Sequence, residues 1–435
     1  MPGLINSAVA ALDARLSPDA DRPLALALSG GGDSMALLHI AADWCAQRGR
    51  RLLALTVDHR LNSGSAAWTA FAGETARAMG AQWRALTWDG PKPAAGLPAA
   101  ARAARHALLA DAARQAGARV ILMGHTADDI AESDWMRKRG ATLGVLREWA
   151  PSPAWPQGRG LMLLRPLLTA SRADLRTLLT SRNASWLEDP ANADPRFLRS
   201  RARAALSHPP HGRTGNPRTE ATAESLRAGD EGRTGPPRIA ADSWSGLLAL
   251  PRAIPAQTLS AALLSVSGQT TPPRGPRLAT LHARLAASAD VTSTLSGARV
   301  QASGDDLLIA REPGRVGLPD LALPVNASAI WDGRFEITTS EPGWRVGPLQ
   351  GRMAALDPAD QAIVKRLHPS ARPALPVLFR DDDPRPVLAW RGAETRCLVA
   401  DRLIAAAGGI GHEDQLTHSS GATPPADLFL SRSGG

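Results

Sequence analysis

A glycine-rich run near the start of the chain has the residue types and spacing needed to hold phosphate. Its members are Ser29, Gly30, Gly31, Gly32, Asp33 and Ser34. Glycines let the backbone close around phosphate oxygens, and a helix N-terminus adds oriented N–H donors. The run lacks the Gly-Lys-Ser/Thr ending of the ordinary nucleotide P-loop, so no lysine in it reaches a terminal phosphate. It therefore predicts a site that holds pyrophosphate as the leaving group of an adenylation, with Asp33 as a magnesium ligand.

A second polar group has the types needed for amine chemistry. His125 directly follows a short apolar stretch at 120–123, and Asp129 and Glu132 are three residues apart at the start of a helical pattern. That spacing places both carboxylates on one helix face, where they could bind an ammonium group and accept its proton. Acids in a first helical turn also complement the helix dipole, and a lone histidine is often structural. The sequence leaves both interpretations open.

Alternating strand and helix patterns indicate which elements position these groups. Apolar strand-like runs at 24–28, 52–57, 82–88 and 120–123 are separated by helical patterns, notably an Ala-rich one at 96–116. Such alternation predicts an α/β fold with a doubly wound parallel sheet, Rossmann-like in type, with its ligand crevice at the carboxyl ends of the strands. The polar clusters at 29–34, 58–59 and 124–132 would meet there.

Positive charge is concentrated in one segment. The chain has 50 basic and 41 acidic residues, a net charge of +9, and residues 137–203 alone hold 13 basic and 5 acidic ones. The arginines singled out there are Arg172, Arg176, Arg196, Arg199, Arg201 and Arg203. A dense run of this kind predicts a polyanion-binding surface, although a solvated helical face would have a similar composition.

Composition narrows the class of protein. An apolar fraction of 44% in 435 residues fits a globular chain of two or three domains. Two cysteines far apart, Cys45 and Cys397, offer neither a zinc ribbon nor a disulfide framework. We find no signal peptide and no apolar stretch of about 18 residues, so we expect a cytoplasmic protein without a membrane helix.

The domain organisation follows from shifts in composition along the chain. We expect a catalytic domain at 1–206 that includes the basic segment 137–206, with a loop leaving the domain at 150–160. A Pro/Gly/Arg-rich stretch at 207–240 predicts a flexible insertion. Beyond it, 241–318 is expected to be a helical domain and 319–435 a C-terminal α+β domain with short strands.

The glycine-rich run resembles the SGGxDS signature of the N-type ATP pyrophosphatases, or PP-loop ATPases. Further runs resemble, in order and spacing, the tRNA(Ile)-lysidine synthetase family over about residues 20–206. They lie at 57–61, 101–106, 124–132, 165–168 and 186–192. Beyond 240 the resemblance is weaker.

This resemblance implies a reaction and a set of roles. ATP, with Mg²⁺, would adenylate the C2 oxygen of the wobble cytidine in a tRNA(Ile) with a CAU anticodon, and L-lysine would displace AMP to form lysidine. Residues 29–34 would bind ATP, and Asp33, Arg105, His125, Asp129 and Glu132 would be catalytic. The six arginines would bind tRNA, as would the domains at 241–318 and 319–435. Oligomeric state is left open.

Three other functions remain possible on the residues alone. A PP-loop tRNA thiolase would also adenylate, but such enzymes generally need catalytic cysteines in the crevice. A small-molecule synthetase shares the loop but does not predict the basic segment. A non-enzymatic RNA-binding protein explains the charge and leaves the loop and its carboxylates unused.

Overall fold

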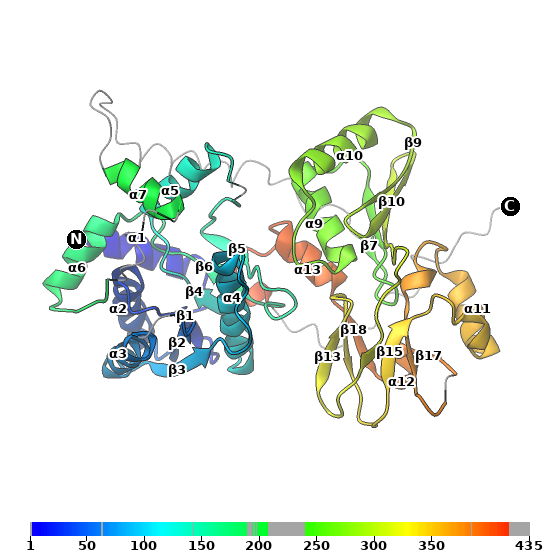
Figure 1. Cartoon of the computed structure of the whole chain (residues 1–435), viewed down its shortest axis with the longest axis horizontal. Coiled ribbons are helices and arrows are strands. Elements are labelled where there is room, and N and C mark those ends of the chain that lie inside the picture. Colours follow the sequence, from blue (N-terminus) through cyan, green and yellow to red (C-terminus); the bar gives the residue numbers. More distant parts are fainter. Residues whose placement is uncertain are drawn as a thin grey trace. The chain divides into compact units, whose positions relative to one another are not determined.

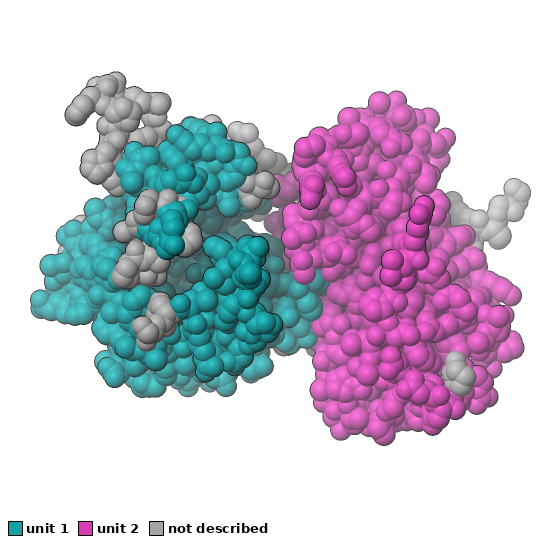
Figure 2. All heavy atoms as spheres, viewed as in Figure 1, with its two compact units in different colours: residues 1–233, 410–417 teal, residues 234–409, 418–435 magenta. Residues whose placement is uncertain are grey.

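The computed structural model describes most of the chain as two compact units. Unit 1 comprises residues 1–233 and 410–417, and unit 2 comprises 234–409 and 418–435 (Figure 2). The described residues are 2–61, 64–141, 143–188, 194, 196, 198–207, 240–383 and 385–416. The expected insertion at 207–240 therefore falls almost wholly outside the described residues.

Unit 1 is built on a six-stranded sheet with strand order β3-β2-β1-β4-β6-β5 (Figure 1). Its strands are β1 (Leu24–Ala27), β2 (Leu52–Asp58), β3 (Gln82–Thr87), β4 (Val120–Leu122), β5 (Trp149–Pro151) and β6 (Met162–Leu164). All neighbouring pairs are parallel except β5 with β6. The predicted doubly wound parallel sheet is confirmed. Residues 150–160 do not leave the domain as expected, because they mostly connect the β5–β6 pair within this sheet.

Helices cover both faces of the sheet. They are α1 (Pro2–Asp13), α2 (Gly32–Gln47), α3 (Ser65–Ala78), α4 (Leu97–Gln115), α5 (Ala127–Arg137), α6 (Arg172–Ser181) and α7 (Leu198–Ser207). Successive strand residues point to opposite faces, so Leu24 and Leu26 pack with α1, α2 and α6, whereas Ala25 packs with α4. Because both faces of the sheet are buried against helices, successive residues of each strand are apolar, and this explains the near-continuous apolar runs in the sequence.

Unit 2 contains three antiparallel sheets. The first sheet has five strands in the order β7-β8-β11-β10-β9. The second has four strands in the order β12-β15-β16-β17, and the third has three in the order β13-β14-β18. The strands are β7 (Ala240–Ala241), β8 (Leu248–Pro251), β9 (Asp290–Leu295), β10 (Ala298–Ser303), β11 (Asp306–Arg311), β12 (Leu321–Ala322), β13 (Ser328–Trp331), β14 (Phe335–Thr338), β15 (Arg345–Pro348), β16 (Pro376–Phe379), β17 (Val387–Leu388) and β18 (Glu394–Cys397). The helices are α9 (Ala256–Ser267), α10 (Gly275–Ala287), α11 (Pro358–Arg366), α12 (Ala389–Gly392) and α13 (Val399–Ala406).

The helical interpretation of residues 241–318 is wrong. Only α9 and α10 are helical there, and the five-stranded sheet occupies about as many residues as these two helices. Alternating burial in β10, where Ala298, Val300 and Ala302 face the core, is the period-2 signal that the Ala-rich composition obscured. No helix in the described part of the chain is long and apolar enough to span a membrane.

A short segment at 410–416 belongs to unit 1 although the chain before it belongs to unit 2. Glu413 is fully buried and accepts from Arg50 Nη2 at 2.6 Å and Nη1 at 2.9 Å, and from Arg22 Nε at 3.1 Å. Arg50 is itself buried, with a fully buried side chain. Because both charges are out of water, each depends on the other for compensation.

Replacing Glu413 with glutamine should therefore destabilise unit 1 strongly. Glu413→Gln leaves the buried Arg50 without its counter-ion, a change expected to lower the free energy of unfolding by about 3–5 kcal/mol. Chemical denaturation followed by circular dichroism measures it. The control is Asp414→Asn, since Asp414 is 58% exposed and its loss should change stability by only about 0.5 kcal/mol. Equal effects of the two substitutions would contradict the prediction.

Candidate active site

The glycine-rich run forms the turn between β1 and α2, at the carboxyl end of the central strand. Gly30 has φ +80°, a left-handed conformation that favours glycine. The Ser34 hydroxyl donates to Gly31 O at 2.8 Å and accepts from Ser29 N at 3.2 Å, so the turn is held by its own hydroxyl groups. The turn is thus preformed, with α2 beginning at Gly32 as an anion site requires.

Two neighbouring segments lie close against this phosphate loop. Leu187 N donates to Gly30 O at 2.9 Å, and Gly31 and Leu187 form a parallel bridge. A methyl group added to Gly124 would lie 3.1 Å from Ser34 N, so the backbone after β4 packs tightly on the loop. The next residue is His125. The structure thereby brings the first and second predicted polar groups to one edge of the sheet.

The predicted acids lie in a cluster of ion pairs with arginines of α6 and α7. Arg172 is the central member, because its guanidinium group contacts Asp33, Asp129 and Glu132. From α7, Arg199 Nη2 lies 2.6 Å from Asp129 Oδ1 and Arg199 Nε lies 2.9 Å from Glu132 Oε2. We call these five residues, with Arg203 on Glu132, the acid–arginine cluster.

Asp129 caps α5 with one carboxylate oxygen and contacts the arginines with the other. Its Oδ2 accepts from Thr126 N at 2.8 Å in a capping box at the start of α5, whereas its Oδ1 faces Arg172 and Arg199. Glu132 is 2% exposed and has no capping role. Burial alone would raise the pKa of Glu132, but the hydrogen bonds and charges of Arg172 and Arg199 hold it below its usual value. Glu132 is therefore an ionised carboxylate at neutral pH.

Asp33 lies in the first turn of α2 and behaves differently. Burial raises the pKa of this carboxyl, and the charges of Arg172 and Arg176 oppose that effect. Arg172 Nε contacts its Oδ2 at 3.3 Å and Arg176 Nη1 its Oδ1 at 3.1 Å. Among the described residues, no group of three or more His, Cys, Asp or Glu side chains could hold a metal ion. A single carboxylate beside a phosphate loop fits Mg²⁺ held mainly by nucleotide phosphates.

His125 and Arg105 lie in a basic cluster with Arg165 and Arg102, in which His125 and Arg165 are buried, Arg105 is half-buried and Arg102 is exposed. Arg165 Nε donates to His125 Nδ1 at 3.1 Å. Because a guanidinium only donates, Nδ1 must be the acceptor and the ring proton must lie on Nε2. Burial, followed by the charge of Arg165, lowers the pKa of His125 well below its usual value. His125 is thus a neutral hydrogen-bond donor.

Arg105 indicates what the basic cluster binds. Its Nε is buried and has no hydrogen-bond partner among the residues that the structure describes. Burial, with the charges of Arg102 and Arg199, lowers the pKa of Arg105 to about 10, and burial lowers the pKa of Arg165 to about 10 as well. Buried cations without local counter-ions are costly, so this cluster fits an anionic ligand.

The six predicted basic-segment arginines divide into two sets. Arg172, Arg176, Arg199 and Arg203 contact carboxylates of the site. Arg196 precedes α7, pairs with Asp194 and is exposed, and Arg201 is exposed on α7. Sequence reasoning missed the positions of Arg102 and Arg165 beside His125, because nothing in the spacing places residue 165 next to residue 125.

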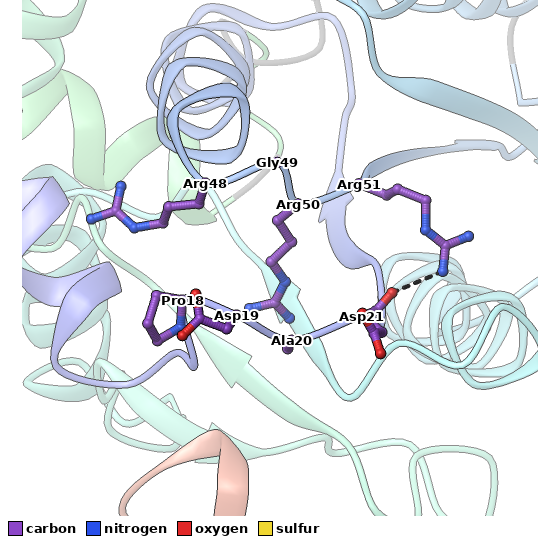
Figure 3. Close-up of a pocket in the computed structure, with 8 residues that line it drawn as sticks. All are labelled: Pro18, Asp19, Ala20, Asp21, Arg48, Gly49, Arg50 and Arg51. Atoms are coloured by element: carbon purple, nitrogen blue, oxygen red, sulfur yellow. Dashed lines mark hydrogen bonds between the residues drawn. The ribbon is translucent and has the colours of Figure 1, made fainter.

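A separate pocket of about 250 Å³ lies at the opposite edge of the sheet (Figure 3). It is lined by the turn at 18–21 before β1 and the turn at 48–51 before β2. Arg51 Nη2 donates to Asp21 O at 2.9 Å across it. These turns precede the strands, whereas the phosphate loop follows one, so this pocket is not part of the site.

Comparison with known families agrees with this geometry. A family profile described as a PP-loop domain matches residues 5–209. That range contains the whole six-stranded sheet, the phosphate loop and the acid–arginine cluster. The chain is therefore a PP-loop protein of the ATP-binding kind.

Full-length relatives identify the family within this class. A tRNA(Ile)-lysidine synthase of Caulobacter vibrioides is 45% identical over 416 residues, covering 93% of this chain and 98% of that protein. The chain is also similar to the tRNA(Ile)-lysidine synthase of Mesorhizobium japonicum, with 37% identity and 72% of each chain covered. The synthase of Ruegeria pomeroyi is 32% identical, with 92% of each chain covered. The chain belongs to the tRNA(Ile)-lysidine synthase family.

The buried histidines near the site predict how stability depends on pH. Burial, then the charge of Arg105, lowers the pKa of His106 to about 3, and within the described part of the chain its Nε2 has no hydrogen-bond partner. The unfolded chain, with a histidine pKa near 6.5, therefore binds one more proton between about pH 3 and 6.5. Stability falls as pH drops through that window and is unaffected by this group above it.

His106→Gln should remove this contribution. The unfolding free energy of the unchanged protein, measured by urea denaturation from pH 7.5 to 5, should fall more steeply with acid than that of the variant. The difference approaches about 1.4 kcal/mol per pH unit, the value for one proton. Identical slopes in the two proteins would show that His106 is not held neutral.

Proposed function

We propose that this chain forms lysidine on a tRNA(Ile) with a CAU anticodon, using ATP and L-lysine. The C2 oxygen of the wobble cytidine bonds to the α-phosphorus of ATP, and pyrophosphate leaves. The lysine ε-nitrogen then bonds to C2 as the C2–O bond breaks, AMP departs with the bonding electrons, and the amine gives up a proton. Family membership supports this reaction, and we expect it to occur in the cytoplasm.

The observation that carries the proposal is the position of two buried carboxylates, Asp129 and Glu132, beside a phosphate loop. Arg172 contacts Asp33 of the loop helix and also Asp129 and Glu132 of α5, so the nucleotide and amine sites are one side chain apart. The cations now on Asp129 and Glu132 are guanidinium groups, and an ammonium group offers the same charge. Such carboxylates can bind the lysine ammonium and accept its proton.

The other site residues have complementary roles in this proposal. Backbone N–H groups of residues 29–34 stabilise the charge that develops on the phosphates, and Arg105 in the basic cluster binds an anionic group of a substrate. Neutral His125 donates through Nε2. Mg²⁺ would be held by Asp33 together with ATP phosphates, where it would neutralise phosphate charge.

Sulfur transfer is not favoured by the cysteines. Burial raises the pKa of the Cys45 thiol, inside α2, and of the Cys397 thiol, in unit 2, to about 11 each. These are the chain's two cysteines. A thiol with a raised pKa is a poor nucleophile at neutral pH, so neither suits a thiolase.

The direct test is label transfer from L-lysine. The protein is incubated with ATP, magnesium, radiolabelled lysine and CAU-anticodon tRNA(Ile), and label in the tRNA is measured with AMP and pyrophosphate. We expect label and AMP in equal amounts. Failure to transfer label, when the Caulobacter vibrioides relative transfers it under the same conditions, would refute the proposal.

Glu132→Gln should weaken the use of lysine selectively. Losing one charged hydrogen-bond acceptor is expected to raise the KM for lysine roughly 10–100-fold, equivalent to about 1.5–3 kcal/mol. Pyrophosphate release in the absence of lysine, which reports adenylation, should be little changed. Asp134→Asn is the matched control on α5, because Asp134 pairs with Arg137 outside the cluster. Equal losses in both half-reactions would contradict an amine-binding role.

The exposed arginines should contribute to tRNA binding through charge. Arg196→Ala and Arg201→Ala are each expected to reduce the slope of log binding constant against log salt concentration by about 1, without changing the KM for ATP. Filter binding of tRNA at several salt concentrations measures the slope. Unchanged slopes in both variants would place the tRNA phosphates elsewhere.

A further inference from the structure

The phosphate loop has more phosphate charge to stabilise than its own residues can neutralise. Pyrophosphate leaves with several negative charges, whereas residues 29–34 contain no cationic side chain and one carboxylate, Asp33. In the ordinary P-loop a lysine supplies the missing cation. Besides Mg²⁺, a cationic side chain can be supplied here by another element, and α6 packs directly against α2.

Arg176 of α6 lies against the first turn of α2. A methyl group added to Gly32 would lie 1.9 Å from Arg176 Nη1 and 2.2 Å from its Cζ, so the guanidinium group covers the backbone where the helix begins. Nη1 also donates to Asp33 Oδ1 at 3.1 Å. A side chain at position 32 would therefore displace the Arg176 guanidinium group from the loop.

The guanidinium group is held in place but keeps spare donors. Its Cζ lies 5.3 Å from the ring centre of Trp186, and Nε lies 3.6 Å from Glu188 Oε1. Both partners flank Leu187, which pairs with the loop backbone. Among the described residues, no acceptor is found for Arg176 Nη2. A guanidinium group has five N–H donors in a fork that suits phosphate oxygens.

Its neighbours in the basic segment are placed differently. Arg172 is surrounded by carboxylates of the acid–arginine cluster, so its charge is already compensated. Arg196 and Arg201 are exposed, as contacts to a large polyanion require. Arg176 is 28% exposed and is recessed on the loop itself. Its position therefore fits a small anion at the loop better than a tRNA backbone.

We propose that Arg176 binds the β- and γ-phosphates of ATP and the departing pyrophosphate. It supplies from α6 the cation that a P-loop lysine supplies from within the loop, and it does not serve as a tRNA contact. This inference rests on the proposed function only in that ATP is cleaved to AMP and pyrophosphate at this loop.

The test compares ligands that differ in these two phosphates. Binding of pyrophosphate, ATP and AMP is measured by calorimetry for the unchanged protein, Arg176→Gln and Arg176→Lys. Arg176→Gln should weaken pyrophosphate and ATP at least about 10-fold, the loss expected for a charged hydrogen bond, and leave AMP within about 2-fold. Arg176→Lys should recover part of the loss, because a point charge also binds phosphate.

Arg182→Gln is the matched control. Arg182 caps the same helix, and its charge pairs with Asp43 away from the loop, so its removal should leave all three affinities unchanged. Thermal unfolding of each variant checks folding, and Arg176→Lys keeps the test decisive if Arg176→Gln is unstable.

Three results would overturn the inference. The first is unchanged pyrophosphate binding in Arg176→Gln. The second is an equal loss of AMP binding, which would indicate that Arg176 only shapes the loop. The third is a reduced salt slope for tRNA binding while pyrophosphate binding stays intact. Loss of pyrophosphate binding in Arg176→Gln, in a protein that transfers no lysine to tRNA, would support the inference while refuting the proposed function.

Discussion

The guanidinium group of Arg172 is the contact on which the arrangement of the site depends. Its three carboxylate partners come from two helices, Asp33 from α2 and Asp129 and Glu132 from α5, and each helix follows a different strand of the sheet. Without a shared cation, the two buried carboxylates and the partly exposed Asp33 at one sheet edge would repel one another. The arginine therefore allows the proposed amine-binding pair and the phosphate loop to lie side by side.

Charge balance also separates the two parts of the crevice. The acid–arginine cluster places arginines directly on carboxylates, whereas the basic cluster around Arg105 and Arg165 has lowered arginine pKa values and an unpartnered Arg105 Nε. One part is suited to a cation and the other to an anion. Lysine, which carries an ammonium and a carboxylate, and ATP, which is a polyanion, together present both kinds of charge.

The sheet of unit 1 and the edge at which the site lies could be predicted from local sequence. Strand–helix alternation predicted the parallel sheet, and residues that follow strands were correctly expected to meet at one edge, since β1 and β4 are adjacent and parallel. The antiparallel sheet of unit 2 was not predicted, although β9, β10 and β11 form consecutive hairpins that pair residues at most 13 positions apart. The turns contain Ser296-Gly297 and Gly304-Asp305, which are local hairpin signals, but the alanines of β10 favoured a helix. The segment at 410–416 differs, because its place depends on Glu413 meeting Arg50, 363 residues away in sequence.

The arginines show most clearly where sequence reasoning ends. Arg172, Arg176, Arg199 and Arg201 look equivalent in a composition count, and a net charge treats them alike. In the structure, Arg172 and Arg199 neutralise Asp129, Arg176 covers Gly32, and Arg201 is exposed. What distinguishes them is which helix face meets which strand end, and this depends on how α6 and α7 pack on α2 and α5. Of the thirteen basic residues in segment 137–203, four contact carboxylates of the candidate site, namely Arg172, Arg176, Arg199 and Arg203. The net charge of the segment therefore overstates the charge that is left to attract RNA.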